Sequence, residues 1–161
     1  MLESSDVVAF VAAADLARAR GFYEGKLGLT AIEQNDFACV FDANGTMLRV
    51  TAVGTVSPAG YTVLGWRVTD IEGTVRELTA RGVEFRHYDG MDQDEYGIWT
   101  TPGGEKVAWF TDPDGNTLSV TQFHSASFGE RAGQDAAPCS WRPTSPGRLA
   151  PTAIGTAAER R

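Results

Sequence analysis

The chain has 161 residues, of which 42% are hydrophobic and 22% charged, which suits one soluble domain with its own core. A formal net charge of −7 disfavours nucleic-acid binding, because phosphates would be repelled. No segment approaches the roughly 18 apolar residues of a membrane span, and the acidic N-terminus does not resemble a secretory signal. Two cysteines provide no disulfide framework, so we expect a cytoplasmic protein that binds neither nucleic acid nor membranes.

The first elements along the chain are predicted to be a strand, a helix and three further strands. An apolar strand begins near Val8, and Asp15 follows as the N-cap of a helix, since its carboxylate can accept hydrogen bonds from free N–H groups. Gly28 is typical of the left-handed residue that ends a helix. Strand-like segments follow at residues 30–33, 37–41 and 47–53, with a hairpin turn at residues 43–45.

The same order recurs in the second half, after a link rich in Gly, Ser and Pro at residues 54–61. An apolar strand begins near Val63, Asp70 precedes a helix, and Gly82 ends it. Strand-like segments follow at residues 83–87, 98–101, 106–111 and 117–122. This internal repeat predicts an α+β fold in which one domain, residues 1–123, consists of two βαβββ modules, residues 7–53 and 61–123.

Residues 124–161 differ in composition from the rest of the chain. They contain four of the seven prolines and abundant Ala, Ser, Gly and Thr, with no sustained periodicity. Such a segment cannot bury enough apolar surface to offset its ordering entropy, so we predict a disordered C-terminal tail.

Short motifs occur in both halves of the chain: Asp15-Leu16, Phe22-Tyr23, residues 27–29, residues 68–71, residues 82–83 and residues 107–118, which include the DPDGN turn at 112–116. Together these segments resemble the motifs of the vicinal-oxygen-chelate superfamily, the glyoxalase, bleomycin-resistance and dioxygenase group. The resemblance covers residues 7–123 and implies a curled mixed sheet around a ligand cup, with the helices outside and two subunits paired as a homodimer. Members of this group differ in activity, so the fold leaves the function open.

In the metal-dependent members, the resemblance implies four ligands from the first and last strands of the two modules. The corresponding positions here are Val8, Arg49, Val63 and Ser119. Valine has no donor atom and a protonated guanidinium repels a cation, whereas a transition-metal site needs three or more donors. We therefore expect no metal ion and no other cofactor.

Strand alternation counted from these positions predicts which side chains face the cup. The candidate ligand-binding residues are Val8, Phe10, Arg49, Thr51, Val63, Arg67, Ser119 and Thr121. The same alternation places Trp66 in the outer core, whereas the orientation of Trp99 and Trp109 on their central strands stays open.

Two arginines in one cup allow two interpretations. Arg49 and Arg67 either bind an anionic or carbonyl-rich small molecule in bidentate fashion, or they pair with acidic neighbours. The acidic neighbours considered are Glu33, Glu84 and Asp94.

The acidic segment 88–97 and His87 before it also have two interpretations each. The segment is either a solvated surface loop or a rim whose carboxylates act as a base or attract a cation. His87 is expected to be partly buried and hydrogen-bonded, with proton transfer as the alternative.

The sequence favours a metal-independent small-molecule-binding protein of the bleomycin-resistance type, with an anionic or oxygenated ligand in the cup. The alternative is a glyoxalase-like lyase or isomerase, or a dioxygenase-related enzyme, in which the arginines stabilise an enolate-like anion. His87 or a loop carboxylate would then be the base, although the sequence assigns no catalytic residue. A third possibility is a non-catalytic domain that binds a partner through its surface.

Overall fold

The computed structural model describes residues 1–124; residues 125–161, which make up nearly all of the predicted tail, lie outside the described part. A short 3-10 turn, η1 (Leu2–Ser4), precedes the first module. The first module consists of β1 (Val8–Ala13), α1 (Leu16–Arg20), η2 (Gly21–Lys26), β2 (Thr30–Gln34), β3 (Ala38–Ala43) and β4 (Thr46–Ala52). The second module consists of β5 (Leu64–Arg67), α2 (Ile71–Ala80), β6 (Ile98–Thr100), β7 (Lys106–Thr111) and β8 (Thr117–Gln122).

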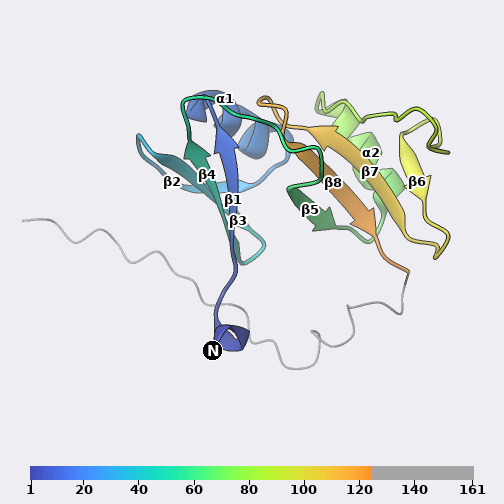
Figure 1. Ribbon diagram of the computed structural model, residues 1–161, viewed down its shortest axis with the longest axis horizontal. Helices are drawn as coiled ribbons and strands as arrows, with labels where there is room; N and C mark the ends of the chain where they lie inside the picture. Colours follow the sequence, from blue (N-terminus) through green and yellow to red (C-terminus); the bar gives the residue numbers. More distant parts are fainter. Residues whose placement is uncertain (125–161) are drawn as a thin grey trace, which may run out of the picture.

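Each module forms its own four-stranded mixed sheet, and Figure 1 shows the two sheets side by side. The strand orders are β1-β4-β3-β2 and β5-β8-β7-β6, so corresponding strands occupy corresponding places. In both sheets the first strand runs parallel to the last, and the remaining pairs are antiparallel. The predicted α+β fold of two βαβββ modules is therefore confirmed.

The helices begin and end where the local chemistry predicts. The Asp15 carboxylate accepts a hydrogen bond from the Arg18 N–H at 3.0 Å, and Asp70 serves α2 in the same way. Gly28 and Gly82 have φ values of 75° and 81°, a left-handed conformation that suits glycine because it has no Cβ.

The first helix changes geometry after one turn. From Gly21 it continues as the π-helix η2, in which the Leu27 N–H bonds to the Phe22 carbonyl five residues earlier. Both Phe22 and Tyr23 lie buried in this wider turn, at 6% and 0% exposure. The motif shared with the family therefore supplies core side chains.

One predicted strand is wrong. In the segment 83–87 only Phe85 makes a bridge, to Phe110 of β7. The chain then leaves the sheet edge through the loop 88–97, and β6 takes the place beside β7 on its return. A short run of apolar and polar residues does not reveal that only one residue of it pairs.

Alternation along the strands separates a core side from an open side. Val11 is 4% exposed, whereas Phe10 beside it is 64% exposed, and Arg49 lies half-buried between the fully buried Leu48 and Val50. In the second module Leu118 and Val120 are buried in the same way. We call the side away from the core the open face; it carries Val8, Phe10, Arg49 and Thr51 in the first module and Gly65, Arg67, Ser119 and Thr121 in the second.

The core sides of both modules share one hydrophobic cluster. The rings of Phe22 and Phe110, from different modules, lie 6.4 Å apart. Trp66 stacks on Phe110 with an interplanar angle of 20°, which confirms its predicted place in the core. Within residues 1–124, none of the helices is long and apolar enough to cross a membrane.

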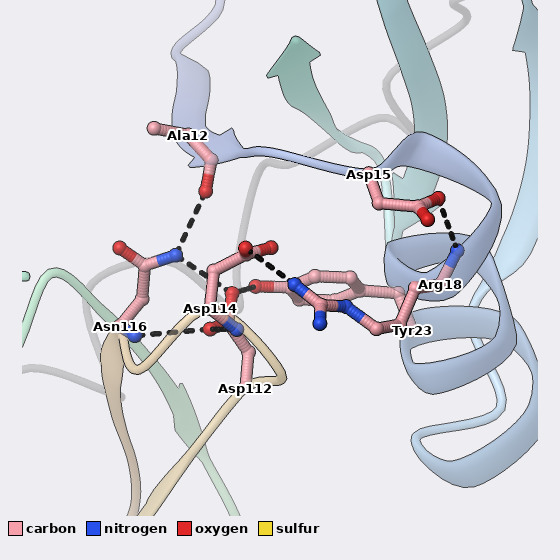
Figure 2. A network of polar contacts seen from close by, with 7 residues as sticks. All are labelled: Ala12, Asp15, Arg18, Tyr23, Asp112, Asp114 and Asn116. Atoms are coloured by element: carbon pink, nitrogen blue, oxygen red, sulfur yellow. Dashed lines mark hydrogen bonds and ion pairs between the residues drawn. The ribbon is translucent and has the colours of Figure 1, made fainter. Parts of the chain in front are cut away.

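A polar seam joins the modules beside this cluster, made by Ala12, Arg18, Tyr23, Asp112, Asp114 and Asn116 (Figure 2). The Tyr23 hydroxyl donates to Asp112 Oδ2 at 2.8 Å, and Asn116 Nδ2 donates to the same oxygen at 2.7 Å. Asn116 Nδ2 also donates to the Ala12 carbonyl at 2.8 Å. The two motifs that resemble the family, Phe22-Tyr23 and DPDGN, therefore meet in space and hold the modules together.

Candidate functional site

The open face of the first module is built by the parallel pair β1–β4. Phe10 pairs with Arg49, and Ala12 pairs with Thr51. Because directly paired residues point to the same side of a sheet, these side chains share one face. Val8 precedes them on β1 and is 41% exposed.

The open face of the second module has the same register with different side chains. Gly65 pairs with Ser119, and Arg67 pairs with Thr121. Arg49 lies opposite the residue two places after Val8, and Ser119 lies opposite the residue two places after Val63. The four positions that carry metal ligands in metal-dependent relatives are thus equivalent between the modules, as the internal repeat predicts.

These four positions do not fit a divalent metal ion. Two valines, an arginine and a serine offer one weak donor, the Ser119 hydroxyl, and a cation that would repel the metal. Within residues 1–124, no three His, Cys, Asp or Glu side chains converge into a possible metal site elsewhere. These side chains therefore do not support metal chemistry at this face.

The guanidinium groups of the two open-face arginines have no polar partner in the described part of the chain. Arg49 is half-buried and Arg67 exposed, and within residues 1–124 neither forms an ion pair or a side-chain hydrogen bond. Other arginines are paired: Arg18 with Asp114 at 2.8 Å and Arg20 with Glu24 at 2.7 Å. The predicted alternative, neutralisation of the open-face arginines, does not occur with any of Glu33, Glu84 and Asp94.

Tryptophan lies on the open face of the second module, an orientation that the sequence left undecided. Trp109 pairs with Ser119 across β7 and β8, and Trp99 pairs with Val107, which pairs with Thr121. Both indoles therefore share the face of Arg67. The apolar residues on both sides of β7 gave no clear alternation from which this orientation could be inferred.

The Trp109 indole crosses the sheet. Its Nε1 donates to the Thr62 hydroxyl at 3.1 Å, just before β5, and β8 lies between the two. Ser119, on the strand that is crossed, is only 6% exposed. Of the predicted site residues, Ser119 is therefore the least accessible, and Thr51 also has a buried hydroxyl without a hydrogen-bond partner in the described region.

A third arginine, Arg86, was missed by sequence reasoning. Its N–H donates to the Trp109 carbonyl at 2.7 Å, next to the Phe85–Phe110 bridge, so its side chain shares the side of Trp109. No sequence signal identifies it, because the segment around it forms no regular strand.

The Gln93 side chain joins the two ends of the loop 88–97. Its side chain accepts from the Tyr88 N–H at 2.6 Å and donates to the carbonyls of Arg86 and Gly97 at 2.9 and 2.8 Å. His87, at the entrance to this loop, is exposed, so the expectation of a partly buried histidine was wrong. The missing strand at 83–87 explains the error, since His87 does not lie within a sheet.

Two cavities adjoin the open face. One, of about 260 Å³, is lined by Val7, Val8, Asp42 and Met47, among others, at the start of β1. The other, of about 520 Å³, lies between the segment 84–89 and the end of β7; its lining is Glu84, Phe85, Arg86, His87, Tyr88, Asp89 and Thr111. Val8 is the one predicted site residue that borders either of these two cavities.

Solved structures with the same fold include several proteins named for different activities. A superfamily member from Sphaerobacter thermophilus is 23% identical with a TM-score of 0.60, covering 76% of this chain and 100% of that one. Fosfomycin resistance protein FosX from Listeria monocytogenes is 13% identical with a TM-score of 0.61, covering 76% and 95%. Lactoylglutathione lyase from Agrobacterium tumefaciens is 19% identical with a TM-score of 0.56, covering 78% and 98%.

At these identities the structures show a common fold and no common activity. A search of curated proteins found no match. The family model of the Glyoxalase/Bleomycin resistance protein/Dioxygenase superfamily matches residues 6–120. That match, together with the paired βαβββ modules and the meeting of their motifs at the seam, shows that the chain belongs to this superfamily.

Proposed function

We propose that this protein binds a small anionic or oxygenated molecule on its open face without a metal ion, in the manner of a bleomycin-resistance-type binding protein. We place this activity in the cytoplasm. Family membership supports a small-molecule site on this face, since the metal positions are equivalent in both modules. The residues now at those positions favour electrostatic and apolar contacts over coordination.

The observation that carries the proposal is the pair of uncompensated arginines. Arg49 and Arg67 lie on the open faces of different modules, and their side chains form no hydrogen bond or ion pair within residues 1–124. In a chain with a net charge of −7, acidic partners are abundant, yet no carboxylate within residues 1–124 forms an ion pair with these two side chains. A guanidinium presents a rigid fork that matches a carboxylate or phosphate, so an anionic ligand would satisfy both.

The proposal includes a homodimer. β1 and β5 each have one paired neighbour, so both modules present a free sheet edge in the described part. Beside the first edge, Val7, Val8 and Phe10 are 72%, 41% and 64% exposed. Placing the first module of one copy against the second module of another would cover these side chains and bring Arg49 and Arg67 to one ligand.

A specific observation also supports the enzyme alternative. Glu84, His87 and Asp89 border the cavity of about 520 Å³ at the end of β7, where Arg86 is also present. A lyase or isomerase would use one of these groups as a base and an arginine to stabilise the resulting anion. Turnover of a bound oxygenated acid, lost in a Glu84→Gln or His87→Asn variant, would favour this alternative over simple binding.

The test of the binding proposal is a thermal-shift and calorimetric screen of the full chain with small carboxylates and inorganic phosphate. A ligand at 100 times its dissociation constant should stabilise the fold by about 2.7 kcal/mol. Arg49→Gln and Arg67→Gln should each weaken binding about tenfold or more, because each removes a charge-assisted contact. Arg76→Gln, on the exposed side of α2, is the matched control and should bind normally.

The same screen with Ni²⁺, Zn²⁺, Mn²⁺ and Fe²⁺ tests the metal-independent part. We expect no saturable shift with any of the four ions. A shift that a chelator reverses would contradict the proposal and favour a metal-dependent glyoxalase- or dioxygenase-type enzyme.

A further inference from the structure

We propose that the open face of the second module binds a planar aromatic carboxylate, whose ring stacks on Trp109 and whose carboxylate pairs with Arg67. This inference rests on the proposed function and names the class of its ligand. It depends on contacts within one module, and so does not require the homodimer.

The first step is the fixed position of the Trp109 indole. Its backbone is held in β7 between β8 and the Phe85–Arg86 segment. Its Nε1 is held at the far side of β8 by the Thr62 hydroxyl at 3.1 Å. Because the backbone and Nε1 are both held, the indole has a fixed orientation across β8. A ring that is already ordered loses little entropy when a ligand stacks on it.

The second step is the aromatic surround of this indole. The ring centroids of Trp99 and Trp109 lie 6.2 Å apart, with an interplanar angle of 32°. The Tyr88 ring packs against Trp109 edge-on, with a centroid distance of 5.8 Å and an angle of 84°. Tyr88 is kept there by Gln93, which accepts its N–H at 2.6 Å. The three rings remain partly accessible, so together they offer an apolar wall and a stacking surface rather than core packing.

The third step is the absence of a side chain at Gly65. This residue pairs with Ser119, and a Cβ built on it would lie 2.7 Å from Ser119 Oγ, so the position has no room for a side chain without a shift. The strand β5 therefore offers backbone alone at this position of the open face. Arg67 follows two residues later on the same face, roughly 7 Å further along the strand.

These three features select a ligand. A ring stacked on Trp109 would extend over Gly65 toward the Arg67 guanidinium, which has no acidic partner within residues 1–124. An aliphatic acid would satisfy the arginine but not the indoles, and an uncharged ring would leave the arginine unpaired. A flat conjugated acid satisfies both.

The test compares two acids of similar size and equal charge, 2-naphthoate and its saturated analogue decahydro-2-naphthoate, by calorimetry on the full chain. Wild type should prefer the planar acid about tenfold, which matches the free energy of an aromatic pair beyond simple burial. Trp109→Leu should abolish this preference. Arg67→Gln should weaken both acids by the same factor and leave their ratio unchanged.

Thr62→Val provides a milder variant, since it keeps the shape of the side chain and removes only the acceptor of the indole N–H. It should reduce the preference for 2-naphthoate several-fold and weaken the near-ultraviolet circular dichroism of the coupled Trp99 and Trp109 rings. Phe37→Leu, which removes an exposed aromatic ring of the first module, is the control and should change neither.

The outcomes separate this inference from the proposed function. Equal binding of both acids in wild type, with Arg67→Gln still weakening them, overturns the stacking inference and leaves anion binding intact. Failure of 2-naphthoate to bind at millimolar concentration also overturns it; Arg67-dependent binding of the saturated acid would then preserve the proposed function. If neither acid binds and no other anion does, both proposals fall.

Discussion

At the seam, one buried carboxylate accepts hydrogen bonds from both modules, whereas on the open face the side chains of two arginines form no hydrogen bond or ion pair within residues 1–124. Asp112 is 4% exposed and its two oxygens accept from Tyr23, from Asn116 twice and from the Asp114 N–H. Arg49 and Arg67 are more accessible and have no such partners. Because solvent reaches these two guanidinium groups, they incur no burial penalty and stay available to pair with an anion, whereas the Asp112 oxygens are already occupied. The difference separates a structural region from a candidate binding one.

Two of the motifs that resemble the family, Phe22-Tyr23 and the DPDGN turn, lie at the seam. In this chain they join the two modules, through the bond from Tyr23 to Asp112 and the bond from Asn116 to the Ala12 carbonyl. The positions that would decide the chemistry carry Val8, Arg49, Val63 and Ser119. Resemblance of the signature therefore identifies the fold and leaves the activity to be worked out from the open face.

The largest effect should come from Asp112→Ala. The change removes the acceptor of four hydrogen bonds in a buried network and leaves their donors unsatisfied, so unfolding should become easier by about 3–5 kcal/mol. Urea denaturation measures this. Asp89→Ala, an exposed carboxylate of the loop, is the control and should cost no more than about 0.5 kcal/mol. A small effect of Asp112→Ala would mean that the seam does not hold the modules together.

Tyr23→Phe should lower the free energy of unfolding by less, about 1–2 kcal/mol, because Asn116 still donates a hydrogen bond to the same Asp112 oxygen. Burial, with the nearby Asp112 carboxylate, raises the pKa of Tyr23 well above its usual value of about 10. The folded chain thus holds this proton more tightly than the unfolded chain does. Its contribution to stability is fully present below pH of about 10 and is lost as the pH rises above that value.

Urea denaturation at pH 8 and at closely spaced values above pH 10 tests this sign. The advantage of wild type over Tyr23→Phe should shrink as the pH rises through that range. An advantage that grew with pH would show that the hydroxyl is not buried against a carboxylate.

Gly65→Ala tests the packing between β5 and β8 on the open face. A Cβ there would meet Ser119 Oγ at 2.7 Å, so the variant should lose about 1 kcal/mol in chemical denaturation. In the Ser119→Ala background the obstacle is gone, and the same change should be neutral or stabilise by up to about 1 kcal/mol. Equal effects in both backgrounds would show that backbone conformation, and not the Ser119 hydroxyl, requires glycine.

The smallest effect on stability should come from Arg49→Gln and Arg67→Gln. Since neither side chain is paired in the described part, each change should alter the free energy of unfolding by less than about 0.5 kcal/mol. The binding of an anionic ligand should nevertheless fall sharply. Unfolding measurements in ligand-free buffer check the first statement. A large loss of stability would reveal a structural role and remove the main support for the binding site.

The sequence alone determined the features that depend on neighbours along the chain. Asp15 and Asp70 cap helices because a carboxylate reaches the N–H groups three residues later, and Gly28 and Gly82 end them because glycine tolerates a positive φ. Alternation on β1 and β4 gave the sides of Phe10 and Arg49 correctly, since one side of each strand is consistently apolar and buried. The internal repeat then gave the two-module fold.

Tertiary structure decided what depends on distance through space. Trp109 lies between residues that are all apolar, so only its pairing with Ser119 and its bond to Thr62 showed which way it points. Whether Arg49 and Arg67 are neutralised depends on how the chain brings carboxylates near them, and composition alone favours neither answer. His87 and Arg86 were misjudged or missed because a single bridge replaced a predicted strand. Local chemistry sets where each element begins, ends and faces, while the contacts between distant elements set which side chains remain free to bind.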